Sequence, residues 1–262
     1  MTLGAQLYSI RDFIQTPEDT RETFRKLKAM GYENVQLSGG GPLPAEFLRD
    51  LSQEFDLPIA SAHDDKERLV NDIDALIREH EIMGCPVLGC GMMPKEYRKT
   101  LEGLRAYEKS METSVKKIRD AGMRFAYHNH DIEFVKPADD PTCSKYLFDI
   151  MVEELDWNFI VDTCWVQFAG EDPAAYLEKV GTDRLWDVHF KDMKKEPRMV
   201  EGKGLKPDFV PCGEGILDFP RLAKKCAELN VLHIYVEQDN AVKKPDPFDE
   251  MRRSFDYLKG VL

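Results

Sequence analysis

Residues 124–133 read RFAYHNHDIE, a short β-rich run that ends in a cluster of imidazoles and carboxylates. The same pattern returns three times further along the chain, in NFIVDT (residues 158–163), LWDVHFKD (185–192) and HIYVEQD (233–239). Each run has the length of a buried strand and is followed at once by chemically active side chains. Carboxylates and imidazoles at successive strand ends can converge on one divalent metal ion. The pattern therefore predicts a metal-dependent enzyme with a small polar substrate.

Short apolar runs alternate with amphipathic stretches along the whole chain. The predicted strands are Leu3–Leu7, Asn34–Leu37, Pro58–Ala62, Pro86–Cys90, Met123–Tyr127, Asn158–Val161, Leu185–Val188 and Leu232–Val236. The predicted helices are Thr16–Met30, Pro44–Phe55, Glu67–Met83, Glu96–Ala121, Cys143–Glu154, Pro173–Val180, Phe219–Leu229 and Pro247–Leu258. Strict alternation indicates a parallel sheet, because parallel strands need crossover helices.

Eight such units in 262 residues fit a single closed (β/α)8 TIM barrel that spans residues 1–262. An open, doubly wound sheet is the alternative, but no GxGxxG motif follows the first strand to support a dinucleotide-binding version of it. Lys194–Gly215 is too long for an ordinary loop, which predicts either a mobile lid or an excursion over the site.

Composition limits the classes of partner. The net charge of -12 disfavours nucleic acid and anionic membranes, which require a basic face. The six cysteines show no CxxC spacing, so we expect reduced thiols in a cytoplasmic protein. The N-terminus lacks the pattern of a signal peptide, and no run approaches the ~20 apolar residues of a membrane span.

In a TIM barrel the carboxyl ends of the strands surround one mouth, where the active site forms. Reading those ends in order gives Gln6, Tyr8, Gln36, His63, Cys90, residues 128–133, Asp162, His189, Lys191 and Glu237. His80 and His233 lie elsewhere, and we expect His80 on the surface of its helix.

Each of these residues also has a purely structural interpretation. Asp162 alone could cap a helix, His63 could be a satisfied loop histidine, and Lys191 could form an ion pair in the barrel wall. Their joint occurrence at several strand ends favours a site. Carboxylate and imidazole ligands without thiolate suit Mn²⁺, Mg²⁺, Co²⁺ or Zn²⁺, which would act as a Lewis acid on a substrate oxygen.

Several of these segments resemble the xylose-isomerase-like sugar phosphate isomerase/epimerase superfamily. The resemblance begins with GAQLYSIR (residues 4–11) and GYENVQ (31–36), and continues through SAH (61–63), YHNHDIEF (127–134), DTCW (162–165), HFKD (189–192), GEG (213–215) with Asp218, and VEQD (236–239). It implies a TIM barrel that binds one divalent metal ion through Glu, Asp, His and Glu. Asp162, His189 and Glu237 match three of these positions; Glu133 is the predicted fourth ligand, with His128 as the substitute.

The resemblance also implies roles in catalysis. Glu237 and Glu133 would transfer protons, with His130 as a further catalytic residue. Substrate contacts would come from Gln6, Tyr8, His63, His128, Trp165, Lys191 and Glu214. The expected partner is a small carbohydrate, and the family's barrels often form homodimers.

Three other functions compete with the isomerase or epimerase. A lyase or hydrolase acting on 3-keto-sugars or cyclitols would use the same enolate chemistry, and gains weight if His128 replaces the first glutamate. A DNA repair endonuclease shares the barrel, but the net charge opposes it. A non-catalytic carbohydrate-binding barrel is the fourth reading.

Overall fold

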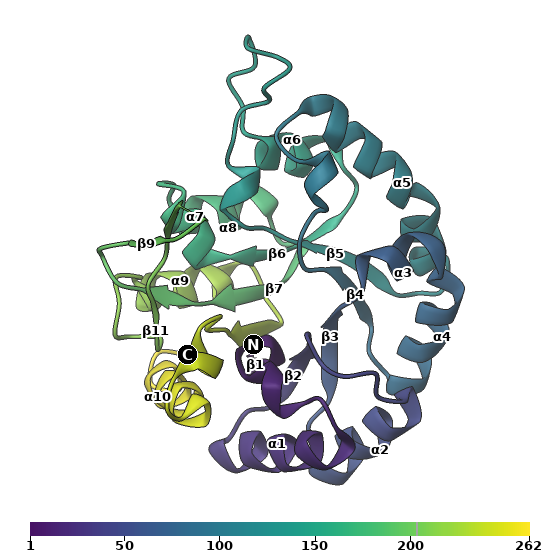
Figure 1. Ribbon diagram of the computed structural model, residues 1–262, viewed down its shortest axis with the longest axis vertical. Helices are drawn as coiled ribbons and strands as arrows, with labels where there is room; N and C mark the ends of the chain where they lie inside the picture. The colour runs from purple at the N-terminus through teal and green to yellow at the C-terminus, as the bar shows by residue number, and fades with distance from the viewer. Residues whose placement is uncertain (203) are drawn as a thin grey trace.

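Eight parallel strands form the closed barrel that the alternation predicts. The computed structural model describes residues 1–202 and 204–262. The barrel strands are β1 (Thr2–Gln6), β2 (Asn34–Leu37), β3 (Ile59–His63), β4 (Val87–Cys90), β5 (Arg124–His128), β6 (Asn158–Asp162), β7 (Leu185–Phe190) and β12 (His233–Val236). Their order around the ring is β1-β12-β7-β6-β5-β4-β3-β2, and β1 also pairs with β2 (Figure 1). The prediction of a single (β/α)8 TIM barrel is confirmed.

Helices form an outer ring around the strands (Figure 1). They are α1 (Pro17–Met30), α2 (Ala45–Phe55), α3 (Lys66–Asn71), α4 (Ile73–Met83), α5 (Leu101–Asp120), α6 (Leu147–Glu154), α7 (Thr163–Phe168), α8 (Pro173–Val180), α9 (Phe219–Glu228) and α10 (Pro247–Leu258). Four 3₁₀ segments join them, namely η1 (Leu7–Phe13), η2 (Lys95–Tyr97), η3 (Asp131–Glu133) and η4 (Ala241–Lys243). No helix in the described part of the chain is long and apolar enough to cross a membrane.

Three predicted helices differ from the observed ones because local capping interrupts them. The predicted helix Glu67–Met83 breaks at Asp72, whose backbone leaves the helical region and whose carboxylate binds Arg68. Helix α5 starts only after Thr100, whose hydroxyl accepts the Gly103 N–H. Helix α6 starts at Leu147 rather than Cys143.

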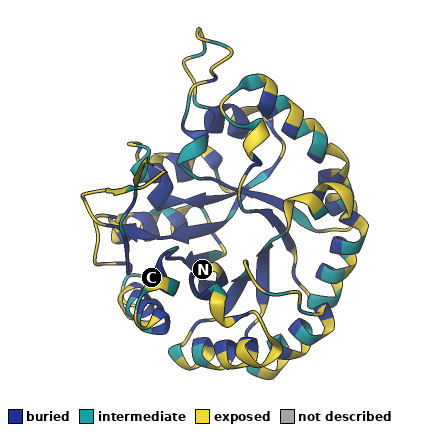
Figure 2. Ribbon diagram, viewed as in Figure 1, coloured by how far each residue is buried: buried dark blue, intermediate teal, exposed yellow. Residues whose placement is uncertain are grey.

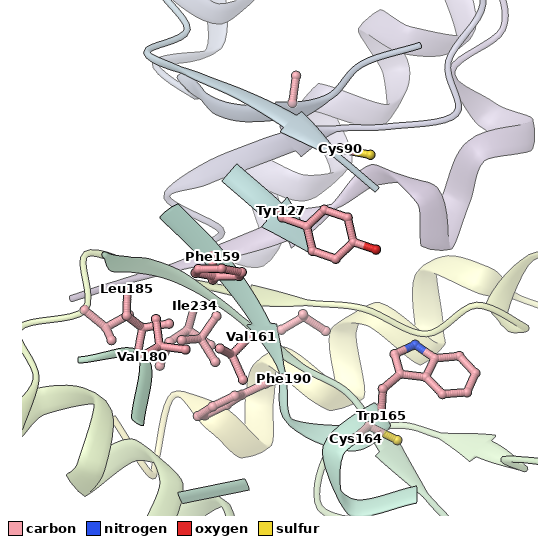
Figure 3. Close-up of a cluster of buried hydrophobic side chains, with 14 of the residues drawn as sticks. Cys90, Tyr127, Phe159, Val161, Cys164, Trp165, Val180, Leu185, Phe190 and Ile234 are labelled. Atoms are coloured by element: carbon pink, nitrogen blue, oxygen red, sulfur yellow. The ribbon is translucent and has the colours of Figure 1, made fainter. Parts of the chain in front are cut away.

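The main core lies between the barrel and the helices. Figure 2 shows the strands as buried and the outward faces of the helices as exposed. Outward-facing strand residues such as Phe159 and Val161 of β6 pack with Val180 of α8 in this layer (Figure 3). Successive strand residues point to opposite faces. Ala126 and Ile160 therefore point into the barrel, where they form a separate small cluster with Val87.

The same alternation carries polar side chains to the mouth of the barrel. His128 and Asp162 follow Ala126 and Ile160 by two residues on their strands and so face inward as well. Strands β3, β5, β6 and β7 each run one or two residues past their predicted ends, because polar residues continue the inner face at the mouth. The functional residues consequently sit on rigid strands.

The long segment after β7 is an excursion that folds over the mouth. It contains the pair β8 (Asp192–Met193) and β11 (Phe209–Val210), and the hairpin of β9 (Arg198–Val200) and β10 (Gly204–Lys206). Asp192 holds the end of the excursion, because its buried carboxylate accepts five backbone N–H groups, from Met193, Gly213, Gly215, Ile216 and Leu217. These hydrogen bonds thus connect the HFKD motif (residues 189–192) to the GEG motif (residues 213–215).

The surface position predicted for His80 is wrong. Its side chain is buried, with Nδ1 3.1 Å from the Cys85 carbonyl and Nε2 3.0 Å from Asp64 Oδ1. Both partners are acceptors, so both ring nitrogens donate and the imidazole is charged. Burial opposes this charge, but Asp64 and, less strongly, Cys85 outweigh it and raise the pKa of His80 to about 11.

Candidate metal centre

Four buried side chains converge at the mouth of the barrel. One ligand atom from each of His128, Asp162, His189 and Glu237 lies within 4.8 Å of the other three. They come from the ends of β5, β6 and β7 and from the residue after β12, which are consecutive strands in the ring. The sequence pattern of polar residues at strand ends therefore does produce one compact cluster.

Asp162 is both the cap of a helix and a member of the cluster. Its Oδ1 accepts the N–H groups of Cys164 and Trp165 and so caps α7. Its Oδ2 is left to face the cluster, 3.3 Å from His128 Nε2. Burial would raise the pKa of Asp162, but the charge of Lys191 and the His128 hydrogen bond outweigh it and lower the pKa. A carboxylate that is ionised and fixed in one orientation is a suitable metal ligand.

The two histidines of the cluster are each held by an outer partner. His128 Nδ1 lies 3.1 Å from the Gly91 carbonyl, which directs Nε2 toward Asp162. His189 Nδ1 lies 2.8 Å from Glu237 Oε2, and its Nε2 lies 2.6 Å from Gln36 Oε1. Burial opposes protonation of His128, but Asp162 outweighs burial and raises the pKa of this ring. Burial and the neighbouring His128 lower the pKa of His189.

Lys191 lies against the cluster as an internal cation. Its Nζ is 3.0 Å from Asp162 Oδ2, 2.9 Å from Glu237 Oε2 and 2.9 Å from Asp239 Oδ1. The ammonium thus forms ion pairs with three carboxylates. Burial opposes its charge, but these carboxylates raise the pKa of Lys191 well above its usual value. Lys191 therefore compensates the charge of these carboxylates beneath the pocket, and it is not among the residues that line the cavity.

The donor set fits a divalent cation. Ligands on opposite sides of an ion with bonds of about 2.2 Å are about 4.4 Å apart, so the observed spread of 4.8 Å requires only small side-chain shifts. Asp162, Glu237 and Asp239 also exceed the single ammonium of Lys191 by two negative charges. Two imidazoles and two carboxylates suit Zn²⁺, Mn²⁺ or Co²⁺ better than Mg²⁺, which prefers oxygen.

Glu133 lies outside the cluster. Its Oε1 accepts the Tyr127 hydroxyl and its Oε2 accepts the His130 backbone N–H at 2.8 Å, inside the barrel wall. Burial raises the pKa of Glu133 to about 7, which the Tyr127 and His130 hydrogen bonds oppose. The structure thus puts His128, the substitute, in the fourth position in place of Glu133.

A cavity of about 650 Å³ opens above the cluster. Of the residues predicted at the site, those that line it are Tyr8, His63, His128, His130, Trp165 and Glu237. Gln6 is fully buried beneath the wall, and Glu214 lies on the surface, paired with Arg253. The structure therefore does not bring Gln6 or Glu214 to the cavity.

The cavity wall carries a group of neutral histidines. The ring of His63 lies 5.0 Å from that of His128 and 5.5 Å from that of His189, and the ring of His130 lies 4.6 Å from that of His128. Burial, together with the charge of His128, lowers the pKa of His63 and of His130 well below the usual value. Buried atoms His63 Nε2 and His130 Nδ1 have no protein partner within the described residues, so they are available for hydrogen bonds to a molecule bound in the cavity.

Sequence reasoning missed three groups of residues at the cavity. Asp239 lines it, and burial, opposed by Lys191, raises the pKa of this carboxyl to about 6. Its position two residues after Glu237 was the available signal, since alternate residues share a face. Asp64, which binds His80, also lines the cavity. The basic residues Lys66, Arg98, Arg198, Lys206 and Lys243 line it from separate loops, which no local pattern connects.

Comparison with known proteins identifies the family. Residues 16–261 match the family model described as a xylose isomerase-like TIM barrel. No match was found among curated protein sequences.

Among solved structures, a sugar phosphate isomerase/epimerase from Parabacteroides distasonis has a TM-score of 0.77 at 22% identity, covering 99% of this chain and 98% of its own. A D-allulose 3-epimerase from Methylomonas sp. has a TM-score of 0.70 at 15% identity, covering 100% and 98%. A probable 3-DHS dehydratase from Bacillus anthracis, involved in petrobactin synthesis, has a TM-score of 0.73 at 14% identity, covering 99% of each chain. At these identities the likeness establishes the shared fold.

Proposed function

The chain belongs to the xylose isomerase-like TIM barrel family, and we propose that it is a divalent-metal-dependent sugar isomerase or epimerase. The observation that carries this proposal is the four-residue donor cluster on the floor of the 650 Å³ cavity. Two of the similar structures bear the names of sugar isomerases or epimerases, which supports carbohydrate as the substrate class.

His128, Asp162, His189 and Glu237 would hold the ion. When bound, a divalent ion supplies Lewis acidity that polarises a substrate carbonyl and makes the neighbouring C–H proton acidic. Trp165 and Tyr8 offer aromatic surfaces on the cavity wall, and Trp165 Nε1 is a buried donor without a protein partner within the described residues. These groups would orient a polyhydroxylated chain above the cluster.

Proton transfer would use groups on two sides of the cavity. Burial would raise the pKa of Glu237, but Lys191 and His189 outweigh it and hold the pKa well below its usual value, so this carboxylate is ionised. Asp239, with a pKa of about 6, stands beside it as a base that is mostly ionised at neutral pH. His130 follows β5, three strands away from β12 around the ring, and its neutral ring would accept a proton on that side and return it from the imidazolium so formed.

A lyase or dehydratase acting on a keto-sugar is the second candidate. The observation that favours it is the position of Glu133 inside the wall, so that no glutamate among the described residues lines the β5 side of the cavity. Removal of the same proton, followed by loss of a leaving group from the next carbon, needs only the bases beside β12. The dehydratase name of one similar structure agrees with this alternative.

The deciding experiment measures carbon-bound proton exchange. Protein stripped of metal and reloaded with Mn²⁺ is incubated in D₂O with a panel of ketoses, aldoses and 3-keto-sugars, and products are followed by NMR. An isomerase or epimerase incorporates deuterium next to the carbonyl, whereas a lyase releases a second product. If no member of the panel shows deuterium incorporation or elimination, both proposed reactions are refuted.

We predict that Glu237→Gln lowers exchange by about 10²–10⁴-fold, the usual effect of a general base. Glu214→Gln is the matched control, because Glu214 pairs with Arg253 outside the cavity. It should keep full activity. Crystals grown with Mn²⁺ should show anomalous density between the four ligands in the wild type, and full activity of Glu237→Gln would remove Glu237 from the mechanism.

A further inference from the structure

His189 can bind a metal ion only through the ring nitrogen that carries no proton. Its Nδ1 faces the cluster, 2.8 Å from Glu237 Oε2 and 3.9 Å from Asp162 Oδ2. Its Nε2 faces the opposite way, 2.6 Å from Gln36 Oε1. The position of one proton therefore decides whether His189 is a ligand at all.

A chain of buried amides leads from the backbone to this proton. The backbone N–H of Tyr8 can only donate, and its partner 3.1 Å away is the side-chain oxygen of Gln6. That contact fixes the orientation of the Gln6 amide, so its NH₂ group faces Gln36. An NH₂ group requires an acceptor, hence Gln36 presents Oε1 rather than its own NH₂ group. The same Oε1 faces His189 Nε2, which must therefore carry the proton.

The far end of the chain agrees with this assignment. The NH₂ group of Gln36 donates to Ser61 Oγ at 2.9 Å, an acceptor suited to it. Gln6, Gln36 and Ser61 are all buried. Turning either amide over would place two N–H groups against each other and leave buried donors without acceptors, which is costly.

We propose that Gln6 and Gln36 are positioning residues that hold the proton of His189 on Nε2 and thereby present Nδ1 to the metal ion. The inference rests on the proposed function only in requiring that a cation binds at the cluster. A metal-binding histidine usually donates its other N–H to a carboxylate, a carbonyl or water. Here the acceptor is a neutral amide, which orients the ring without adding a fourth negative charge to the three carboxylates around Lys191.

Two measurements on the full chain test the proposal. The tautomer of His189 is read from two-bond ¹H–¹⁵N NMR spectra of metal-free, ¹⁵N-histidine-labelled protein, with assignment by the signals lost in His189→Asn. The expected result is a proton on Nε2, donated to Gln36, whatever the proton occupancy of Nδ1 beside the Glu237 carboxylate. Affinity for Mn²⁺ is measured by calorimetry for the wild type and three variants.

Gln36→Met removes the acceptor at nearly constant volume and should weaken Mn²⁺ binding about 10–100-fold. Gln36→Glu restores an acceptor oxygen and should bind Mn²⁺ at least as tightly as the wild type. The matched control is Gln238→Met, since Gln238 is equally buried but donates to Asn240 and Glu250 away from the cluster. It should lose stability without losing affinity, and thermal melts of all variants verify folding.

The outcomes separate this proposal from the proposed function. A wild type without a proton on Nε2 overturns the amide chain whether or not Mn²⁺ binds, and so does wild-type affinity in Gln36→Met. A wild type with the proton on Nε2 that binds no Mn²⁺ would instead refute the metal site, and with it the role of the two glutamines in ligation.

Discussion

At the scale of single residues, the site depends on a balance of buried charges. Lys191 is 1% exposed and touches three carboxylates, two of which are proposed metal ligands. Removing one partner from a buried ion pair leaves an uncompensated charge and costs about 3–5 kcal/mol. The ammonium thus lets the carboxylates remain ionised and close together before a cation arrives.

We therefore predict that Lys191→Met lowers the free energy of unfolding of the metal-free protein by about 3–5 kcal/mol. Mn²⁺ should recover part of this loss, because a cation shared by Asp162 and Glu237 replaces the missing charge. Urea unfolding with chelator and with Mn²⁺ measures both effects. Lys117→Met is the control, since Lys117 pairs with Asp74 at the surface. Its loss should cost about 1 kcal/mol or less and be insensitive to Mn²⁺. An equal loss for Lys191→Met in both conditions would contradict the prediction.

The fourth ligand shows what residue-level sequence reasoning could and could not find. Asp162, His189 and Glu237 follow from strand ends alone, because alternation and the barrel geometry bring them together. Glu133 was preferred to His128 as the more usual carboxylate, but position on the strand decided the outcome. His128 ends β5 and faces inward, whereas Glu133 lies beyond the strand and turns back to bind Tyr127.

At the scale of elements, buried polar contacts fasten helices and loops to the barrel. His80 of α4 reaches Asp64, just after β3, and Asp64 also accepts the Gly89 N–H of β4. This contact holds the connection that follows His63 in place. Helix periodicity could not reveal it, because a polar residue on an amphipathic helix usually faces solvent.

The pair predicts a specific dependence of stability on pH. The pKa of His80 is about 11 in the folded protein against 6.5 without its surroundings. Below pH 6.5 His80 is protonated in both the folded and the unfolded state, so the stabilisation by its charged imidazole is complete. Above pH 6.5 only the folded state keeps the proton. The stabilisation then falls by up to roughly 1.4 kcal/mol per pH unit until about pH 11.

The difference in unfolding free energy between the wild type and His80→Gln should therefore shrink between pH 6.5 and 9.5 in urea titrations. His233→Gln serves as the control. Burial lowers the pKa of His233, so its ring is mostly neutral above pH 6.5 in both the folded and the unfolded protein. The difference in unfolding free energy between the wild type and His233→Gln should therefore stay nearly constant above that pH. A constant difference for His80→Gln as well would mean that its imidazole is not charged in the folded protein.

Asp192 predicts a second effect at the level of an element. Its carboxylate accepts five backbone N–H groups, and a Cβ added to Gly215 would lie 2.2 Å from Asp192 Oδ1. Asp192→Asn puts an NH₂ group against some of these donors and should cost roughly 2–4 kcal/mol, as expected for lost hydrogen bonds to a charged group. Hydrogen exchange should accelerate at residues 213–217, while exchange in β5 stays slow. Unchanged exchange in the loop would contradict this role.

Element prediction succeeded where periodicity and caps agreed, and failed where long-range contacts decide. Helix α1 begins after Thr16, has Pro17 at its first position and ends at Gly31 in the left-handed conformation, as the sequence indicates. Helix α7 was missed, because its cap is Asp162, a residue that also belongs to the cluster. The hairpin β9–β10 was likewise read as irregular, since its strands are short and its residues are mostly polar.

At the scale of the whole molecule, the overall charge and the charge of the cavity differ. The chain carries a net charge of -12, whereas the cavity is lined, among the described residues, by five basic side chains, Lys66 and Lys243 among them, and by five acidic ones, Asp239 among them. Overall charge argues against a nucleic-acid partner but contains no information on this local balance of basic and acidic groups, which the fold creates from distant loops. A homodimer stays a prediction, which light scattering would test.

A metal ion bound at the cluster should stabilise the entire barrel, because its ligands come from four consecutive strands in the ring. At a free concentration of 100 times Kd, a ligand specific for the folded state adds about 2.7 kcal/mol. For a chain of this size, 1 kcal/mol shifts Tm by about 2–4 °C, so Mn²⁺ should raise Tm by roughly 5–11 °C over protein in chelator. His128→Ala, which lacks one ligand, should lose most of this shift, whereas Glu214→Gln should keep it. A Tm that does not respond to Mn²⁺ in the wild type would refute the cluster as a metal centre.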